Sequence, residues 1–119
     1  MSMESVRKTF DEIKEQYPDF MLRWRKEPAE LRVPGGERLV DVQRRAWAGL
    51  NRIVAGHEEN ETVVVVSHNF PIIGIICHIT RTHLDNYRAF RVEPCGHTRL
   101  HLDSGAWRVT HINGKVYMP

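Results

Sequence analysis

The stretch that decides the fold is Thr62-Val63-Val64-Val65-Val66-Ser67-His68-Asn69-Phe70-Pro71. Its four consecutive valines are β-branched and show no polar alternation, which is typical of a strand buried on both faces of a parallel sheet. His68 and Asn69 follow at the expected carboxyl edge of that strand. Pro71 fits the first position of a helix, so the sequence predicts a strand, a short turn and a helix in quick succession.

Helices are predicted on both sides of this strand. The run from Phe70 to Ile79 is rich in isoleucine, but as a strand it would place Pro71 and Gly74 inside a sheet, where both residues are disfavoured. A helix is therefore the better interpretation. Upstream, apolar residues recur at steps of three and four from about Glu37 to Val54, which predicts a long amphipathic helix that stops at Gly56.

Two shorter helices are expected nearer the N-terminus. Thr9 and Glu12 have the spacing of a capping box, which predicts a helix that ends at Pro18. Asp19 predicts the cap of a second helix, which closes before Pro28. The apolar and aromatic residues of these two helices are Phe10, Ile13, Tyr17, Phe20, Met21 and Trp24. Tyr17, Phe20, Met21 and Trp24 have the helical spacing of core residues.

The last third of the chain has the pattern of a β-hairpin. Thr98 to Asp103 alternates, Ser104-Gly105 is a turn pair, and Ala106 to Ile112 continues as a second strand. The order helix, strand, helix, hairpin gives an α/β fold class, with helices that flank a small sheet.

Composition excludes several functions. The chain has 119 residues, of which 41% are hydrophobic and 27% charged, as expected for one globular domain. No apolar run reaches the roughly 18 residues of a membrane span, so no membrane partner is expected. The net charge of +2 comes without a block of Lys or Arg, so nucleic acid is not expected either.

The cysteine and histidine spacings point to no metal and no cofactor. Two cysteines, Cys77 and Cys95, cannot form a disulfide-dense scaffold, which favours a reducing cytoplasm. We expect Cys77 to be buried and Cys95 to be exposed. No histidine and cysteine spacing matches a zinc site, and no cofactor motif is present.

The junction at His68 is the candidate site. Open α/β sheets bind ligands outside the carboxyl ends of their strands. A helix N-terminus adds unpaired amides and a positive dipole end, which suit an anion. A histidine there suits a phosphate, because it donates charge and a hydrogen bond when protonated and transfers a proton when neutral. A histidine that only satisfies the strand's last carbonyls is the open alternative.

Several segments occur in a distinctive order. They are Thr9 to Lys14, Tyr17-Pro18, Trp24, Pro34-Gly35-Gly36-Glu37, Asp41-Val42, Arg45, Val63 to His68, Gly105-Ala106-Trp107-Arg108 and Ile112-Asn113. Together they resemble the histidine phosphatase (phosphoglycerate mutase-like) superfamily, and in particular small bacterial phosphoglycerate mutase-like and alpha-ribazole phosphatases. The resemblance spans nearly the whole chain and implies an incomplete phosphoglycerate mutase-like sheet flanked by helices, with a C-terminal β-hairpin.

The resemblance also implies a mechanism. In that family a nucleophilic histidine in an Arg-His-Gly motif accepts the phosphoryl group, and a second histidine in Ser-His-Gly binds it. His68 matches the second histidine, so a catalytic and phosphate-binding role is implied for it. Asn69 stands where glycine is usual; its backbone amide is expected to contact phosphate, although its β-carbon crowds the approach. Arg45 matches a recurrent arginine with a structural role, and capping and dipole complementation of the long helix account for Glu37. In the family, the region of Tyr17, Phe20, Met21 and Trp24 helps to cover the substrate, but their helical spacing favours core packing.

The chain lacks a sequence motif that is typical of the family. It contains no Arg-His-Gly, and the family's first strand, second arginine and acidic proton donor have no counterpart. The remaining histidines are His57, His78, His83, His97, His101 and His111. None is predicted at a strand end followed by glycine, so each is expected to be exposed or hydrogen-bonded. Three explanations stay open: a shortened phosphatase, a C-terminal half that works with an N-terminal partner, or a remnant that only binds.

Two functions from different classes follow. The first is hydrolysis of phosphoric monoesters through a phosphohistidine, with this chain inactive or impaired because the nucleophile is missing. The second is a non-catalytic α/β module that binds phosphate or self-associates. Either way, residues 1–119 are expected to form a single partial domain whose ligand is a small phosphorylated metabolite or inorganic phosphate. Loss of the first strand would expose Val63 to Val66, so a homo-oligomer through that sheet edge is expected.

Overall fold

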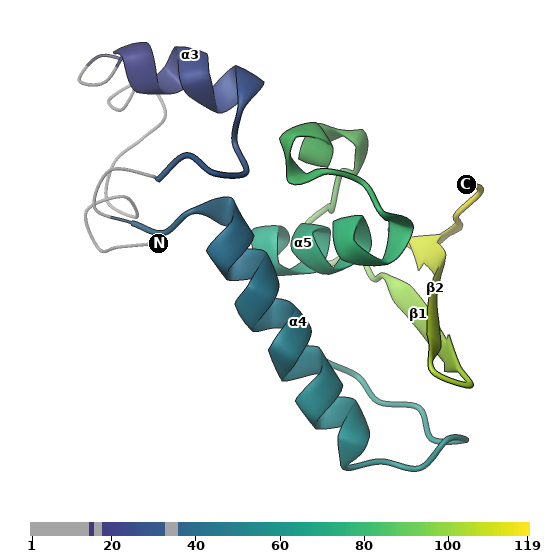
Figure 1. Cartoon of the computed structure of the whole chain (residues 1–119). Helices are drawn as coiled ribbons and strands as arrows, with labels where there is room; N and C mark the ends of the chain where they lie inside the picture. The colour runs from purple at the N-terminus through teal and green to yellow at the C-terminus, as the bar shows by residue number, and fades with distance from the viewer. Residues whose placement is uncertain (1–14, 16–17, 33–35) are drawn as a thin grey trace.

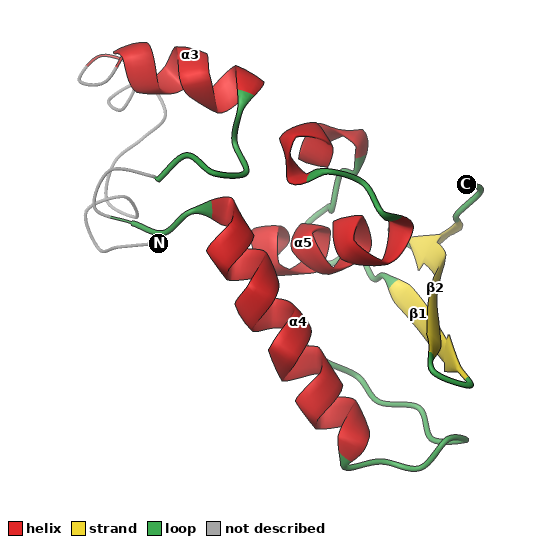
Figure 2. Cartoon of the chain, viewed as in Figure 1, coloured by secondary structure: helices red, strands yellow, loops and turns green. Residues whose placement is uncertain are grey.

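Two crossed helices, α4 (Leu39–Ala55) and α5 (Asn69–Thr80), form the centre of the fold in the computed structural model, which describes residues 15, 18–32 and 36–119 (Figure 1). α3 (Pro18–Lys26) precedes them, and the 3₁₀-helix η1 (Leu84–Ala89) follows α5. The strands are β1 (Arg99–Asp103), β2 (Ala106–Ile112) and β3 (Lys115–Val116), which pair antiparallel in the order β1-β2-β3. The predicted mixed α/β class is confirmed (Figure 2).

The predicted helices are present with small shifts in their ends. α3 begins at Pro18, so Asp19 lies in its first turn and is not its cap. α5 begins at Asn69 with His68 as N-cap, so Pro71 occupies the third helical position and not the first. Proline is tolerated there because amides of the first turn have no intrahelical partner. The capping box at Thr9 lies outside the described residues, as do Tyr17 and, apart from the helical Glu15, the rest of the helix predicted between them.

The core has two adjoining clusters. The larger joins Ala29 and Leu39 to Ile73 and Cys77 of α5 and to Leu84 of η1. The smaller joins Trp24 of α3 to Leu31. Both clusters contact Phe70 and Tyr87, so they form one continuous apolar interior. The core packing predicted for Phe20 and Trp24 is confirmed, since Phe20 packs against the second cluster and Trp24 is part of it.

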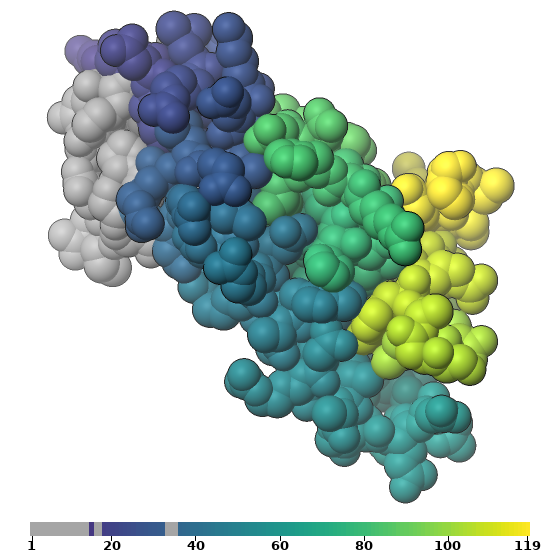
Figure 3. Space-filling model, viewed as in Figure 1, coloured from purple at the N-terminus to yellow at the C-terminus, as the bar shows by residue number. Residues whose placement is uncertain are grey.

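The predicted buried strand at the valines is wrong. Residues 62–67 belong to no strand, and their backbone groups make no hydrogen bond to any described residue. Val64 is 85% exposed and Val66 is 91% exposed. A strand buried on both faces needs neighbours on both edges, and no described strand pairs with this segment, which is drawn as loop in Figure 2. The loop that leads into it forms the lower tip of the molecule (Figure 3).

The C-terminal hairpin is confirmed. β1 and β2 pair from Arg99 opposite His111 to Asp103 opposite Ala106. Ser104 and Gly105 have φ of 50° and 83°, as a two-residue type I′ turn requires. β3 was not predicted, although Asn113-Gly114 is itself a strong hairpin signal and has φ of 52° and 74°.

A glycine sets the approach of α5 to α4. A β-carbon at Gly74 would lie 3.2 Å from the Cα and Cβ atoms of Gln43 on α4. The Gln43 side chain crosses the same contact, where its Nε2 donates to the Gly74 carbonyl at 2.9 Å. Helix backbones meet this closely only where one of them lacks a side chain. The position of α5, and of everything at its two ends, therefore depends on Gly74.

We predict opposite effects for two glycine-to-alanine substitutions. Gly74→Ala overpacks the helix contact at a cost of about 1–3 kcal/mol, partly offset by the roughly 1 kcal/mol that alanine gains in a helix, so unfolding should become easier. Gly49→Ala on α4 meets nothing within 4 Å and should stabilise the protein by about 0.5–1 kcal/mol. Urea unfolding of both variants measures the difference. Equal stabilisation by both would contradict the assigned role of Gly74.

Candidate functional site

His68 lies at the start of α5 with its side chain exposed. As N-cap it has φ −137° and ψ −176°, and its side chain makes no capping hydrogen bond. Its ring has no hydrogen-bond or ion-pair partner among the described residues, so the alternative in which it satisfies strand carbonyls is not observed. The imidazole is therefore available to a ligand from solvent.

The first turn of α5 offers two amides beside that ring. The Ile72 amide donates to the His68 carbonyl at 3.2 Å, which begins the helical ladder. Pro71 has no N–H, so only the Asn69 and Phe70 amides are left without an intrahelical acceptor. An anion at this end can take two backbone hydrogen bonds and the positive end of the helix dipole. Asn69, like His68, is exposed here.

An aromatic cluster fixes the start of α5. The Phe70 ring lies 6.2 Å from Trp24 and 5.6 Å from Tyr87, both edge-on, measured between ring centroids. Trp24 in turn stacks on Phe20 at 5.9 Å. Such pairs contribute about 0.5–1.5 kcal/mol each beyond their buried area. These ring contacts pack α3 and η1 against Phe70, two residues after His68. They therefore hold the N-terminus of α5, which carries the candidate site.

A groove of about 470 Å³ opens beside Asn69. Its apolar part comes from Ile73, Phe90 and Val92, and its polar part includes Tyr87, Arg88 and Arg91. Sequence reasoning missed the two arginines. Arg88 lies in the short 3₁₀-helix η1 and Arg91 lies just after it. A helix this short has no apolar periodicity, so no signal in the sequence marks the two arginines.

Asn113 holds the wall of this groove in place. Its Oδ1 accepts from the Glu93 amide at 2.9 Å, and its Nδ2 donates to the Arg91 carbonyl at 2.6 Å. Gly96 permits the contact, since a β-carbon there would lie 2.6 Å from the same Oδ1. The loop after η1 is thus fastened to the turn between β2 and β3.

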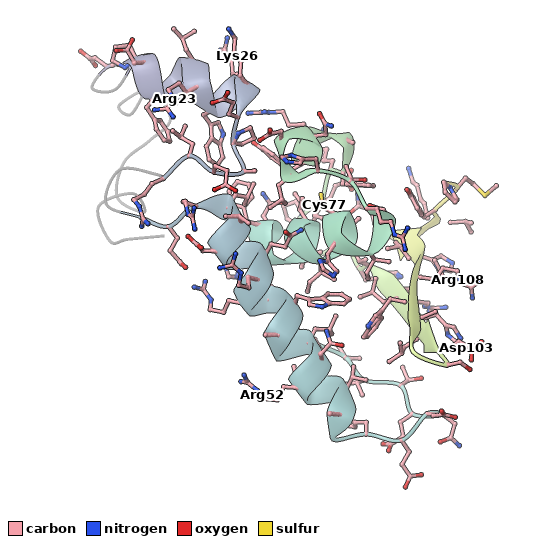
Figure 4. The ribbon with its side chains drawn as sticks, in the orientation of Figure 1. Arg23, Lys26, Arg52, Cys77, Asp103 and Arg108 are labelled. Carbon is pink, nitrogen blue, oxygen red and sulfur yellow. The ribbon has the colours of Figure 1, made fainter. Side chains whose placement is uncertain are left out.

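The remaining sequence candidates have structural roles. Arg45 bonds Glu37, and this bond is the largest cause that lowers the pKa of Glu37. The N-cap position of α4 is Arg38 and not Glu37, which lies one residue before it at the N-terminal end of the helix. Cys77 is buried on α5 (Figure 4), and burial raises the pKa of its thiol to about 11, which leaves it unreactive. Cys95 is exposed, as predicted.

The other histidines form no second centre. Nδ1 of His57 lies 2.8 Å from the Ile53 carbonyl, and Nδ1 of His83 accepts from the Asp85 amide. The His78 ring packs on Trp47 with 4.1 Å between centroids. In the part of the chain that the structure describes, no group of three or more histidine, cysteine, aspartate or glutamate side chains could hold a metal ion. None of the described helices has the length and apolar content needed to cross a bilayer.

Known proteins identify the family. The chain matches the model of the histidine phosphatase superfamily (branch 1) over residues 2–115. Because this match covers nearly the whole sequence, the chain belongs to the histidine phosphatase superfamily.

Individual relatives agree with this assignment. Phosphoserine phosphatase 1 of Hydrogenobacter thermophilus is 31% identical over 93 residues, which cover 78% of this chain and 44% of that protein. The structure of Bacillus stearothermophilus YhfR has a TM-score of 0.81 at 29% identity, over 93% of this chain and 55% of that one. The mycobacterial glucosyl-3-phosphoglycerate phosphatase Rv2419c, solved with VO3, has a TM-score of 0.73 at 26% identity, over 90% and 55%. The chain spans about half the length of these relatives.

We predict that Asn113→Gly loosens the groove wall. Glycine keeps the positive φ of 52° but removes both hydrogen bonds, each with a net contribution of about 0.5–1.5 kcal/mol. Stability in urea should fall by roughly 1–2 kcal/mol, and the Glu93 amide should exchange faster with deuterium. Ser104→Gly is the matched control, because Ser104 has φ 50° and an exposed side chain. An effect of equal size in both variants would contradict the role of Asn113.

Proposed function

We propose that this chain contributes the phosphate-binding part of a histidine phosphatase site, with His68 as its central residue. The observation that carries the proposal is an exposed, unpartnered imidazole at the N-cap of α5, beside the two free amides of that helix. The ligand is a small phosphorylated metabolite or inorganic phosphate. The names of the relatives, a phosphoserine phosphatase and a glucosyl-3-phosphoglycerate phosphatase, support this ligand class.

The proposed role of His68 is electrostatic. A phosphoryl group bound at the first turn of α5 would accept from the Asn69 and Phe70 amides, and the protonated imidazole would donate a charged hydrogen bond. Phosphoryl transfer is catalysed mainly by positioning and by neutralising charge on the transferring group, which such donors supply. The reaction assigned to the site is hydrolysis of a phosphoric monoester through a phosphohistidine.

The chain does not complete that reaction by itself, in our proposal. It contains no Arg-His-Gly, so the nucleophile that the family uses is missing from its sequence. A phosphate-binding module without turnover is the resulting state of this chain alone. We further propose that residues 1–119 form one partial domain and that the protein is cytoplasmic, which its two free cysteines support.

Phosphate binding tests the site. Titration calorimetry with inorganic phosphate at pH 6 should show binding to the parent chain and a loss of about tenfold or more in His68→Ala, because a charge-assisted hydrogen bond contributes about 1.5–3 kcal/mol. His101→Ala is the control, since His101 is exposed on β1 and distant in sequence from α5. An unchanged isotherm in His68→Ala removes the proposed site. An aryl phosphate should be hydrolysed little or not at all, and His68-dependent turnover would show that a nucleophile was overlooked.

A second candidate function is self-association, which the valine segment favours. Val63 to Val66 are 38%, 85%, 48% and 91% exposed, and no backbone group of residues 62–67 is hydrogen-bonded to a described residue. An apolar segment whose backbone groups are unpaired is a template for strand pairing with another chain. We therefore propose a homo-oligomer in which this segment of one copy pairs with the same segment of another.

Sedimentation tests the oligomer. The parent chain should sediment as a dimer or larger species, and Val64→Lys should dissociate it, because the lysine charge would have to be buried in the paired edge. Leu22→Lys is the control, since Leu22 is 61% exposed but lies on α3. A parent chain that sediments as a stable, folded monomer contradicts this second candidate.

A further inference from the structure

A second pocket, of about 360 Å³, lies at the other end of α5 from His68. The end of α5, the loop after it, the first turns of α4 and the segment before α4 all contribute to its lining. Ala29, Val40 and Leu84 give it an aliphatic wall. Its charged side chains include Arg81, at the C-cap of α5, and Glu30. This pocket therefore combines apolar surface with both signs of charge.

Hydrogen bonds through Ala29 hold the aliphatic wall in place. The Ala29 amide donates to Oδ1 of Asp85 on η1 at 3.0 Å, and the Ala29 carbonyl accepts from the Val40 amide of α4 at 3.0 Å. Ala29 itself is 2% exposed. Segments far apart in the sequence are thus joined at one side of the pocket, so its shape belongs to the fold and not to one loop.

The end of α5 fixes the backbone of Arg81 at the pocket. Arg81 has φ of 58°, and its amide donates to the His78 carbonyl at 3.4 Å. The Thr82 amide donates to the Cys77 carbonyl at 2.9 Å, so the chain turns sharply at this point. The guanidinium of Arg81 has no hydrogen-bond or ion-pair partner among the described residues. Its positive charge is left for a ligand.

Glu30 supplies a negative charge to the same pocket. Its Oε2 accepts from the Arg38 guanidinium at 2.9 Å, whereas its Oε1 has no partner among the described residues. Arg81 and Glu30 line one pocket without forming an ion pair with each other. Two opposite charges that are kept apart in this way suit a ligand that carries both signs. The negative end of the α5 dipole also favours a ligand with a cationic group over a simple anion.

We infer that this pocket binds a free α-amino acid with an aliphatic side chain. The carboxylate of the amino acid takes two parallel hydrogen bonds from the Arg81 fork. Its ammonium group meets Oε1 of Glu30, and its side chain lies on the wall that contains Ala29. A peptide terminus would offer only one of the two charges, so the free amino acid is the better fit. The inference does not rest on the proposed phosphate site, which lies at the opposite end of α5.

Matched ligands test the pocket by NMR titration of the isotope-labelled chain. L-leucine carries both charges, 4-methylpentanoate lacks the ammonium group, and 3-methylbutylamine lacks the carboxylate. Leucine should bind about threefold or more tighter than either analogue, since each exposed charge pair contributes a modest amount. Glycine should bind more weakly than leucine, because it has no side chain to lie on the aliphatic wall. The amide signals of Thr82 and Leu84 should shift.

Variants assign each charge to a residue. Arg81→Gln should remove the preference for leucine over 3-methylbutylamine and keep the preference over 4-methylpentanoate, whereas Glu30→Gln should do the reverse. Arg52→Gln and Glu59→Gln are the matched controls and should keep both preferences. Arg52 is an exposed arginine of α4 (Figure 4), Glu59 is exposed in the loop after α4, and neither lines the pocket. The amide spectra also show whether each variant is folded.

Three results overturn the inference: no titration with leucine, equal affinity for leucine and its two analogues, or preferences that stay unchanged in both pocket variants. His68→Ala should bind leucine as the parent chain does, which separates this pocket from the phosphate site. If phosphate fails to bind and leucine binds as described, only the phosphate site is lost. If leucine fails to bind, the phosphate site is unaffected.

Discussion

The close contact between α4 and α5 at Gly74 is the constraint on which the rest of the structure depends. It brings the backbone of α5 against Gln43 of α4, and the Gln43 amide group bonds the Gly74 carbonyl across the gap. With that contact set, Ile73 and Cys77 reach the core, and the N-terminus of α5 has a fixed position. The aromatic residues around Phe70 then hold the same terminus from the other side. His68, the N-cap of α5, is therefore held in place by the packing of the two helices.

The candidate site combines a helix end with an adjoining groove, and separate parts of the sequence supply the two. His68 and Asn69 come from the start of α5, whereas Arg88 lies in η1 and Arg91 just after it. The hairpin contributes as well, because Asn113 fastens the groove wall through the Arg91 carbonyl. The C-terminal hairpin therefore helps to shape the groove, because the turn between β2 and β3 carries Asn113.

Local patterns predicted the elements, and tertiary neighbours decided the rest. The apolar period of α4 and the turn pair Ser104-Gly105 are properties of short segments, so helix and hairpin were predicted correctly. The four valines predicted a buried strand, but burial on both faces depends on partners that the pattern does not contain. The place of His68 at the start of α5 followed from the sequence because the histidine and the helix start are adjacent in the chain. Arg88 and Arg91 could not be found that way, since only folding brings them next to Asn69.

The residues just before the valines limit how copies of this chain can stack. Glu58, Glu59 and Glu61 lie within the five positions before Val63, where the apolar run begins. In a parallel, in-register arrangement of many chains, these carboxylates would lie directly above one another, and their repulsion would oppose fibril growth. An antiparallel pair places them at opposite ends of the ladder, far from their counterparts. If copies of this chain pair through the valine segment, as proposed above, these acidic residues therefore favour a closed two-fold pairing over open-ended aggregation.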